Sequence, residues 1–138
     1  MKVRASRELL ASVEEVWGFL AEPHHLADWW PGIAGVQPDR RGLAPGARWR
    51  VSGGPQPGLL RRPNDSWTLV ITAVEPAQRL AFHLTGDRID AELTLEPRGR
   101  DRTQAELELR SPFLLGTRRS LAKDALERLH ALVQTGAN

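Results

Sequence analysis

Three residues whose side chains could bind a metal ion lie close together near the start of the chain: His24, His25 and Asp28. On a helix, these positions would place two or three metal ligands near one another, because residues three and four apart are neighbours. No further histidine lies nearby in the sequence, and the segment is short. We therefore interpret the three residues as the solvated face of a short helix and predict no metal site.

Motifs of nucleophilic or cofactor chemistry do not stand out in the sequence either. No Ser, His and Asp grouping has the support of a known motif, and no nucleophile elbow occurs. The glycines form neither a phosphate-binding loop nor a dinucleotide fingerprint. His83 stands between Phe82 and Leu84, so in a strand it points to the opposite face from them. The sequence predicts no cofactor and gives no identifiable catalytic motif.

Composition narrows the class of protein further. The 138 residues suit one domain, residues 1–138, and the absence of cysteine excludes disulfides and thiolate metal sites. The net charge is only +2, and the arginines are dispersed among carboxylates, whereas a nucleic-acid-binding protein is expected to concentrate them on one face. No apolar run approaches a membrane span, and the first residues lack a signal-peptide core. We expect a cytoplasmic protein that binds no nucleic acid.

The strongest structural signals lie between Ser12 and Gly32. Ser12 and Glu15 have the spacing of a capping box, in which each side chain satisfies a free backbone N–H at the start of a helix. Pro23 ends this helix, and a second short helix precedes the Trp-Trp-Pro-Gly turn at residues 29–32. Four apolar residues fall on one face of the first helix: Val13, Val16, Trp17 and Leu20.

The remainder of the chain predicts strands followed by one long helix. The expected strands are residues 2–10, 33–37, 47–52, 66–74, 79–85, 88–96 and 102–110. The last two strands alternate cleanly between apolar and polar residues, which is typical of an antiparallel sheet with one dry face and one solvated face, so we expect their polar residues to be solvated. Ser111 and Pro112 form a helix start, and an apolar stripe continues to Gln134.

This order of elements resembles the START-like superfamily, also called SRPBCC, over essentially the whole chain. The superfamily includes polyketide cyclase/dehydrase-like proteins and relatives of the heat-shock ATPase activator. The resemblance implies an α+β helix-grip fold: a curved antiparallel sheet of six to seven strands around a long C-terminal helix, with two short helices after the first strand.

A helix-grip fold implies a space between its two layers. A curved sheet and a straight helix cannot touch along their whole length, so large side chains fill the middle or a cavity remains. Small inward residues such as Ala91 and Ala105 would leave the space open. Trp30, Trp49 and Trp67 are equally compatible with pocket walls and with an ordinary core. The predicted ligand-binding residues are Trp30, Trp49, Trp67, Phe82, Phe113 and Arg118.

Arg118 interrupts the apolar stripe of the final helix. It lies four residues after Leu114 and three before Leu121, where an unpartnered cation would be costly. Two interpretations stay open. Its guanidinium extends to the rim of the fold, or it faces the cavity and holds a carboxylate, enolate or phenolate of a ligand.

Three functions remain as hypotheses. The first is binding of a small hydrophobic or aromatic molecule in the cavity, with residues 54–65 as a mobile flap near its mouth. The second is a cyclase or dehydratase acting on a polyketide-like or aromatic substrate in the same cavity. The third is a protein-interaction module like the heat-shock ATPase activator, which would favour a large exposed apolar patch. We favour the first, for a monomer or homodimer.

Overall fold

The computed structural model describes residues 2–53, 66–86, 88–112 and 120–136. Three predictions therefore lie outside the described residues: the ligand-binding roles of Phe113 and Arg118, and the flap at 54–65. The predicted helix start at Ser111 and Pro112 is described but is not helical, residues 113–119 also lie outside the described residues, and the final helix is described from Leu121.

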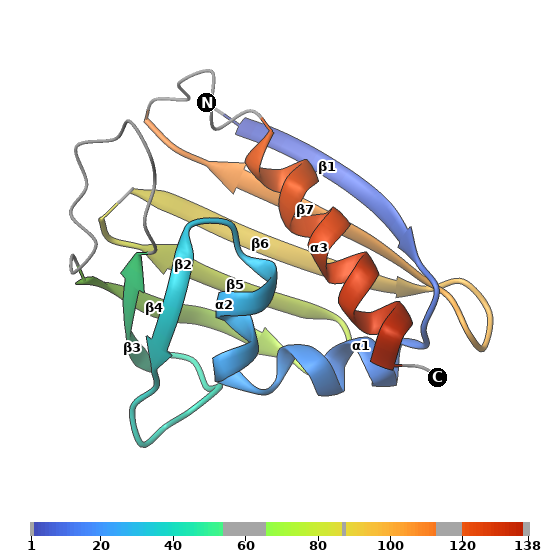
Figure 1. Cartoon of the computed structure of the whole chain (residues 1–138), viewed down its shortest axis with the longest axis horizontal. Coiled ribbons are helices and arrows are strands. Elements are labelled where there is room, and N and C mark those ends of the chain that lie inside the picture. The colour runs from blue at the N-terminus through green and yellow to red at the C-terminus, as the bar shows by residue number, and fades with distance from the viewer. Residues whose placement is uncertain (1, 54–65, 87, 113–119, 137–138) are drawn as a thin grey trace.

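The described elements follow the predicted order (Figure 1). The strands are β1 (Lys2–Leu9), β2 (Ile33–Gln37), β3 (Arg48–Gly53), β4 (Ser66–Glu75), β5 (Arg79–Leu84), β6 (Ile89–Pro97) and β7 (Thr103–Arg110). The helices are α1 (Val13–Leu20), the 3-10 turn η1 (Pro23–His25), α2 (Leu26–Trp29) and α3 (Leu121–Gly136).

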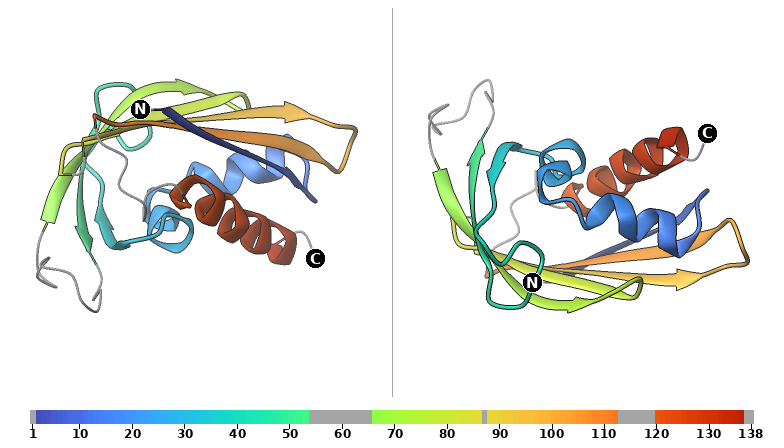
Figure 2. Two further views of the ribbon diagram at one scale, coloured as in Figure 1. Left: turned by 90° about the horizontal axis from the view of Figure 1, so that it is seen from above. Right: turned by 90° about the horizontal axis from the view of Figure 1, so that it is seen from below.

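All seven strands form one antiparallel sheet in the order β1-β7-β6-β5-β4-β3-β2. The sheet curls, and the helices lie inside its curve, with α3 running along β1 and β7 (Figure 2). This arrangement confirms the predicted helix-grip fold. None of the helices in the described ranges is long and apolar enough to cross a membrane.

One half of the predicted capping box is present at the start of α1, whereas the Glu15 carboxylate accepts from the Ser12 hydroxyl and not from the Ser12 backbone N–H. The Ser12 hydroxyl accepts a hydrogen bond from the backbone N–H of Glu15 at 3.1 Å, and it donates one to the Glu15 carboxylate, also at 3.1 Å. The helix then buries Val16 and Leu20 against the sheet. Pro23 begins η1, so the predicted break after α1 is confirmed.

Alternation along the strands decides which side chains reach the core. In β6, Ile89, Ala91, Leu93 and Leu95 are buried on the concave face, and α3 buries Ala122, Ala125, Leu126, Leu129 and Val133 against that face. An ion pair between Arg7 of β1 and Glu127 of α3, 2.9 Å long, closes the outer edge of this packing. The core therefore lies between the curved sheet and the helices.

Candidate functional site

Aromatic rings occupy the concave face where α2 approaches the middle of the sheet. The Trp30 ring meets Phe82 of β5 edge-on, with centroids 5.1 Å apart. Trp29 packs edge-on against Trp30 at 5.4 Å. All three side chains are buried, so they bridge part of the space between the helices and β5. Trp29 was missing from the predicted site, although its place beside Trp30 in the Trp-Trp turn was a usable signal.

Trp49 lies on the same face and is fixed by the β2–β3 connection. Its indole Nε1 donates a hydrogen bond to the Gly42 carbonyl at 2.8 Å, and its side chain is buried. The connection is itself held by Asp39, whose carboxylate accepts from the backbone N–H groups of Arg48 and Arg41. These bonds, that of Arg48 most strongly, lower the pKa of Asp39. Trp49 is therefore a rigid part of the wall.

Trp67 differs from the other aromatic residues because it is only partly buried. It stands opposite Val51 in the β3–β4 ladder, and Val51 is fully buried, so the indole belongs to the concave face. The Gly53 and Gly86 backbones flank the ring. A Cβ atom would lie 3.2 Å from the ring at Gly53 and 3.0 Å at Gly86. The two glycines thus leave room for the indole.

The structure therefore brings four of the predicted residues to one face. Trp30 and Phe82 touch, and Trp49 and Trp67 lie diagonally across the β3–β4 pair, two positions apart in register. The diagonal spacing in such a pair is within reach of aromatic side chains. Sequence reasoning missed Gly53 and Gly86, because neither alternation nor turn chemistry shows which side chain a glycine accommodates.

Polar groups near the helix layer are largely engaged in structural contacts. The buried Thr103 hydroxyl donates to the Ala11 carbonyl at 2.8 Å. His25 stacks on Phe19 with ring centroids 4.2 Å apart, and its Nδ1 lies 2.8 Å from the Phe19 carbonyl oxygen. Within the described ranges, no group of three His, Asp or Glu residues is placed to hold a metal ion.

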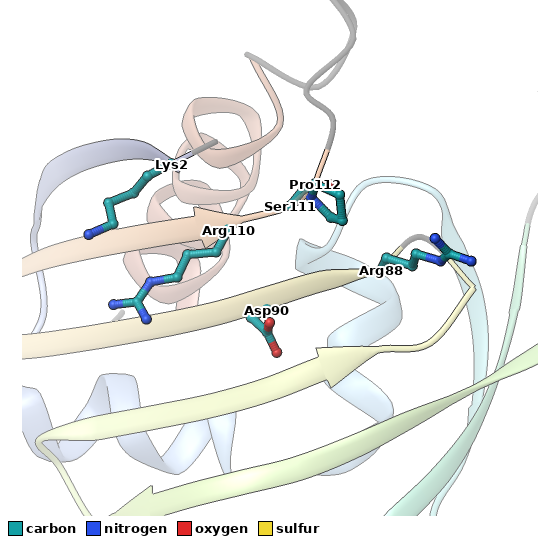
Figure 3. Close-up of a pocket in the computed structure, with 6 residues that line it drawn as sticks. All are labelled: Lys2, Arg88, Asp90, Arg110, Ser111 and Pro112. Carbon is teal, nitrogen blue, oxygen red and sulfur yellow. The ribbon is translucent and has the colours of Figure 1, made fainter.

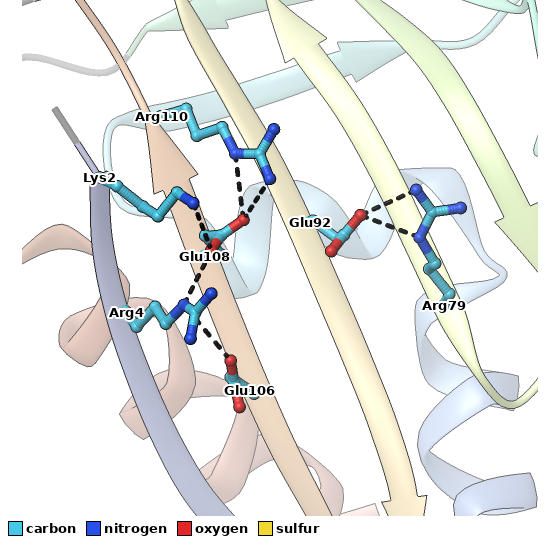
Figure 4. A network of polar contacts seen from close by, with 7 residues as sticks. All are labelled: Lys2, Arg4, Arg79, Glu92, Glu106, Glu108 and Arg110. Atoms are coloured by element: carbon cyan, nitrogen blue, oxygen red, sulfur yellow. Dashed lines mark hydrogen bonds and ion pairs between the residues drawn. The ribbon is translucent and has the colours of Figure 1, made fainter.

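The convex face of the sheet carries an ion-pair network that corrects one prediction (Figure 4). The polar residues of β7 were expected to be solvated, but Glu108 is buried, with its side chain only 7% exposed. Arg4 Nε donates to it at 2.8 Å and Arg110 donates through Nε and Nη2 at 3.1 and 2.9 Å, while Lys2 Nζ lies 3.8 Å away. The long cationic side chains from β1 and β7 cover the carboxylate.

Solved structures with the same fold come from several organisms. A START superfamily protein from Mycobacterium smegmatis has a TM-score of 0.67 and 17% identity, over 99% of this chain and 95% of that one. An AHSA1-like protein from Aeromonas hydrophila has a TM-score of 0.76 and 17% identity, over 99% and 94%. The di-domain ARO/CYC protein BexL of the BE-7585A biosynthetic pathway has a TM-score of 0.76 and 18% identity, over 100% of this chain and 48% of BexL.

At these identities the structural likeness establishes the fold alone. No curated protein matches the sequence. A family model does, however, match residues 1–135, nearly the whole chain, and it describes polyketide cyclases, dehydrases and lipid transport proteins. The START-like resemblance is thereby confirmed, and the chain belongs to the polyketide cyclase/dehydrase and lipid transport family.

Proposed function

We propose that the protein binds a small apolar or aromatic molecule on the concave face of the sheet, against Trp67. The observation that carries this proposal is the contrast among the aromatic residues: Trp30, Trp49 and Phe82 are buried, whereas Trp67 keeps part of its surface accessible. Among these four residues, Trp67 is therefore the one whose side chain a ligand can contact, and the three buried rings form the wall behind it.

The surroundings of Trp67 suit a planar ligand. The contacts with Gly53 and Gly86 restrict where the indole can move, so a ligand that stacks on it meets a surface already in place. Stacked or edge-on aromatic pairs contribute about 0.5–1.5 kcal/mol beyond the apolar area that they bury. A preformed surface also lowers the ordering cost of binding. Phe113 and Arg118 complete the proposed site as predictions, with Arg118 orienting an acidic group.

Binding is favoured over catalysis by the polar groups that the structure describes. Proton transfer needs an acid or base within reach of the substrate. Thr103 is engaged with the Ala11 carbonyl, and Arg7 is paired with Glu127 at the edge of α3. A cyclase or dehydratase activity remains the second candidate. It is supported by the family description and by the likeness to BexL, an ARO/CYC protein.

The proposal is tested by calorimetric titration with a planar polyphenol, 2-naphthol and dodecanoate. Trp67→Leu keeps an apolar side chain but removes the aromatic face, and we expect it to weaken the planar ligands about two- to tenfold, the equivalent of one aromatic pair. The matched control is Trp17→Leu, another partly buried tryptophan, on helix α1, which contacts β6 and α3.

Dodecanoate, which has no ring to stack, is expected to lose less affinity than the planar ligands. Circular dichroism of both variants checks that the fold is retained. Equal losses for Trp67→Leu and Trp17→Leu would contradict the proposed site, and no heat of binding from any of the three ligands would contradict the proposed function.

A further inference from the structure

A hollow lies on the convex side of the sheet, away from the aromatic wall (Figure 3). It is an open pocket of about 390 Å³ at the end of the sheet where β1 and β6 begin and β7 ends. Its lining consists of Lys2, Arg88, Asp90, Arg110, Ser111 and Pro112. Three of these side chains are cationic and one is a carboxylate, so the lining carries excess positive charge.

The strand register places these charges in one row across the convex face. Lys2 pairs with Arg110 between β1 and β7, Arg110 pairs with Asp90 between β7 and β6, and Asp90 pairs with His83 between β6 and β5. The Asp90 carboxylate already has a partner, because His83 Nδ1 lies 2.8 Å from its Oδ1. Lys2 and Arg110 stand side by side in this row, and both contact the carboxylate of Glu108.

Glu108 does not cancel these two cations. Its carboxylate is shared among Lys2, Arg4 and Arg110, and the Arg4 bond is the shortest of the contacts at 2.8 Å. Arg4 also lies 3.8 Å from Glu106, so two carboxylates face three cations in this network. The Lys2 ammonium is only loosely held, at 3.8 Å, and half of the Lys2 side chain is exposed. Charge and donors on this row therefore remain available to a ligand.

Arg88 supplies the third cation at the opposite end of the pocket (Figure 3). Its side chain is exposed and forms no hydrogen bond or ion pair with any other residue that the structure describes. Its backbone has φ of 55°, in the left-handed region that residues other than glycine adopt at a cost. Such conformations cluster at binding and catalytic sites.

We propose that this pocket binds an oxyanion, a carboxylate or a phosphate, through Arg88, Lys2 and Arg110. Guanidinium groups match the planar edge of a carboxylate and the oxygen pairs of a phosphate, and the lysine ammonium adds a mobile point charge. Nothing in this inference depends on the apolar site, because the pocket residues lie on the other face of the sheet. The anion is either free in solution or the acidic group of a larger ligand.

The test is a titration of the ¹⁵N-labelled protein with inorganic phosphate, at constant ionic strength maintained with chloride. We expect amide shifts at Lys2, residues 88–90 and residues 110–111. Arg88→Gln and Lys2→Gln should each weaken phosphate about two- to fivefold, as for a solvent-exposed ion pair. The matched control is Arg100→Gln, which removes the same charge from an exposed arginine in the turn between β6 and β7, at the other end of these strands.

The outcomes separate specific binding from general electrostatics. Equal weakening by Arg88→Gln and Arg100→Gln, or phosphate shifts that avoid the pocket residues, would overturn the proposal. Titrations with dodecanoate and dodecanol then distinguish the two sources of anion. If the protein binds dodecanoate more tightly than dodecanol and this preference decreases in Arg88→Gln, the anion is the acidic group of a larger ligand. If the preference is unchanged while Arg88→Gln still weakens phosphate binding, the anion is free in solution.

Discussion

Replacing Glu108 by Gln tests how much the convex ion-pair network stabilises the fold. The substitution keeps the shape of the side chain but removes the charge that Arg4 and Arg110 contact at 2.8–3.1 Å. Breaking a fully buried pair costs about 3–5 kcal/mol, and a hydrogen bond to a charged group contributes about 1.5–3 kcal/mol. The two arginine side chains are 62% and 59% exposed, so water compensates them in the variant. We therefore expect a loss of about 1.5–3 kcal/mol in unfolding free energy.

The loss should depend on pH with a defined sign. The hydrogen bond from Arg4, together with that from Arg110 and the charges of Lys2 and Arg110, holds the pKa of Glu108 below its ordinary value of 4.5. A carboxyl whose pKa is lower in the folded state stabilises the protein above the unfolded pKa, and this contribution is lost as the pH falls through the folded pKa. The difference between the wild-type protein and Glu108→Gln should therefore be complete at neutral pH and shrink below 4.5.

Urea denaturation followed by far-ultraviolet circular dichroism measures both effects, since urea, unlike guanidinium chloride, leaves ion pairs unscreened. The matched control is Glu106→Gln on the same strand and face. Glu106 is half exposed and lies 3.8 Å from Arg4, so its loss should stay below about 1 kcal/mol. Equal losses for the two variants, or a Glu108→Gln loss that is the same at neutral and acid pH, would refute the reasoning.

Two further substitutions test the packing of α3 and the anchoring of β7. Leu129→Ala removes a fully buried side chain from the centre of the α3 stripe and should cost about 2–5 kcal/mol in urea denaturation. Glu127→Ala, which loses only the exposed pair with Arg7, should cost less than about 1 kcal/mol. Similar losses of unfolding free energy in Leu129→Ala and Glu127→Ala would mean that the buried face of α3 is assigned wrongly. Thr103→Val leaves the Ala11 carbonyl without its 2.8 Å donor and should cost about 1–3 kcal/mol, whereas an unchanged denaturation midpoint would contradict this anchoring role.

The order and type of the elements could be predicted from the sequence because their signals are local. The capping box at Ser12 and Glu15, the break at Pro23 and the alternation from Ile89 to Leu95 each depend on residues a few positions apart. Alternation also assigns a side chain to one face of a strand, which is why Trp49, Trp67 and Phe82 could be placed together. These patterns together indicated the helix-grip fold.

Which residues meet across the sheet was decided by the tertiary structure. Alternation predicted a solvated Glu108, but its burial depends on Arg4, 104 residues away, and on the register that aligns β1 with β7. Equally, three of the predicted aromatic residues are buried whereas Trp67 is only partly buried, and the Gly53 and Gly86 backbones beside its ring come from two segments that are distant in the sequence. A local pattern fixes the face of a strand, whereas register and curvature, which involve the whole sheet, determine the neighbours on that face.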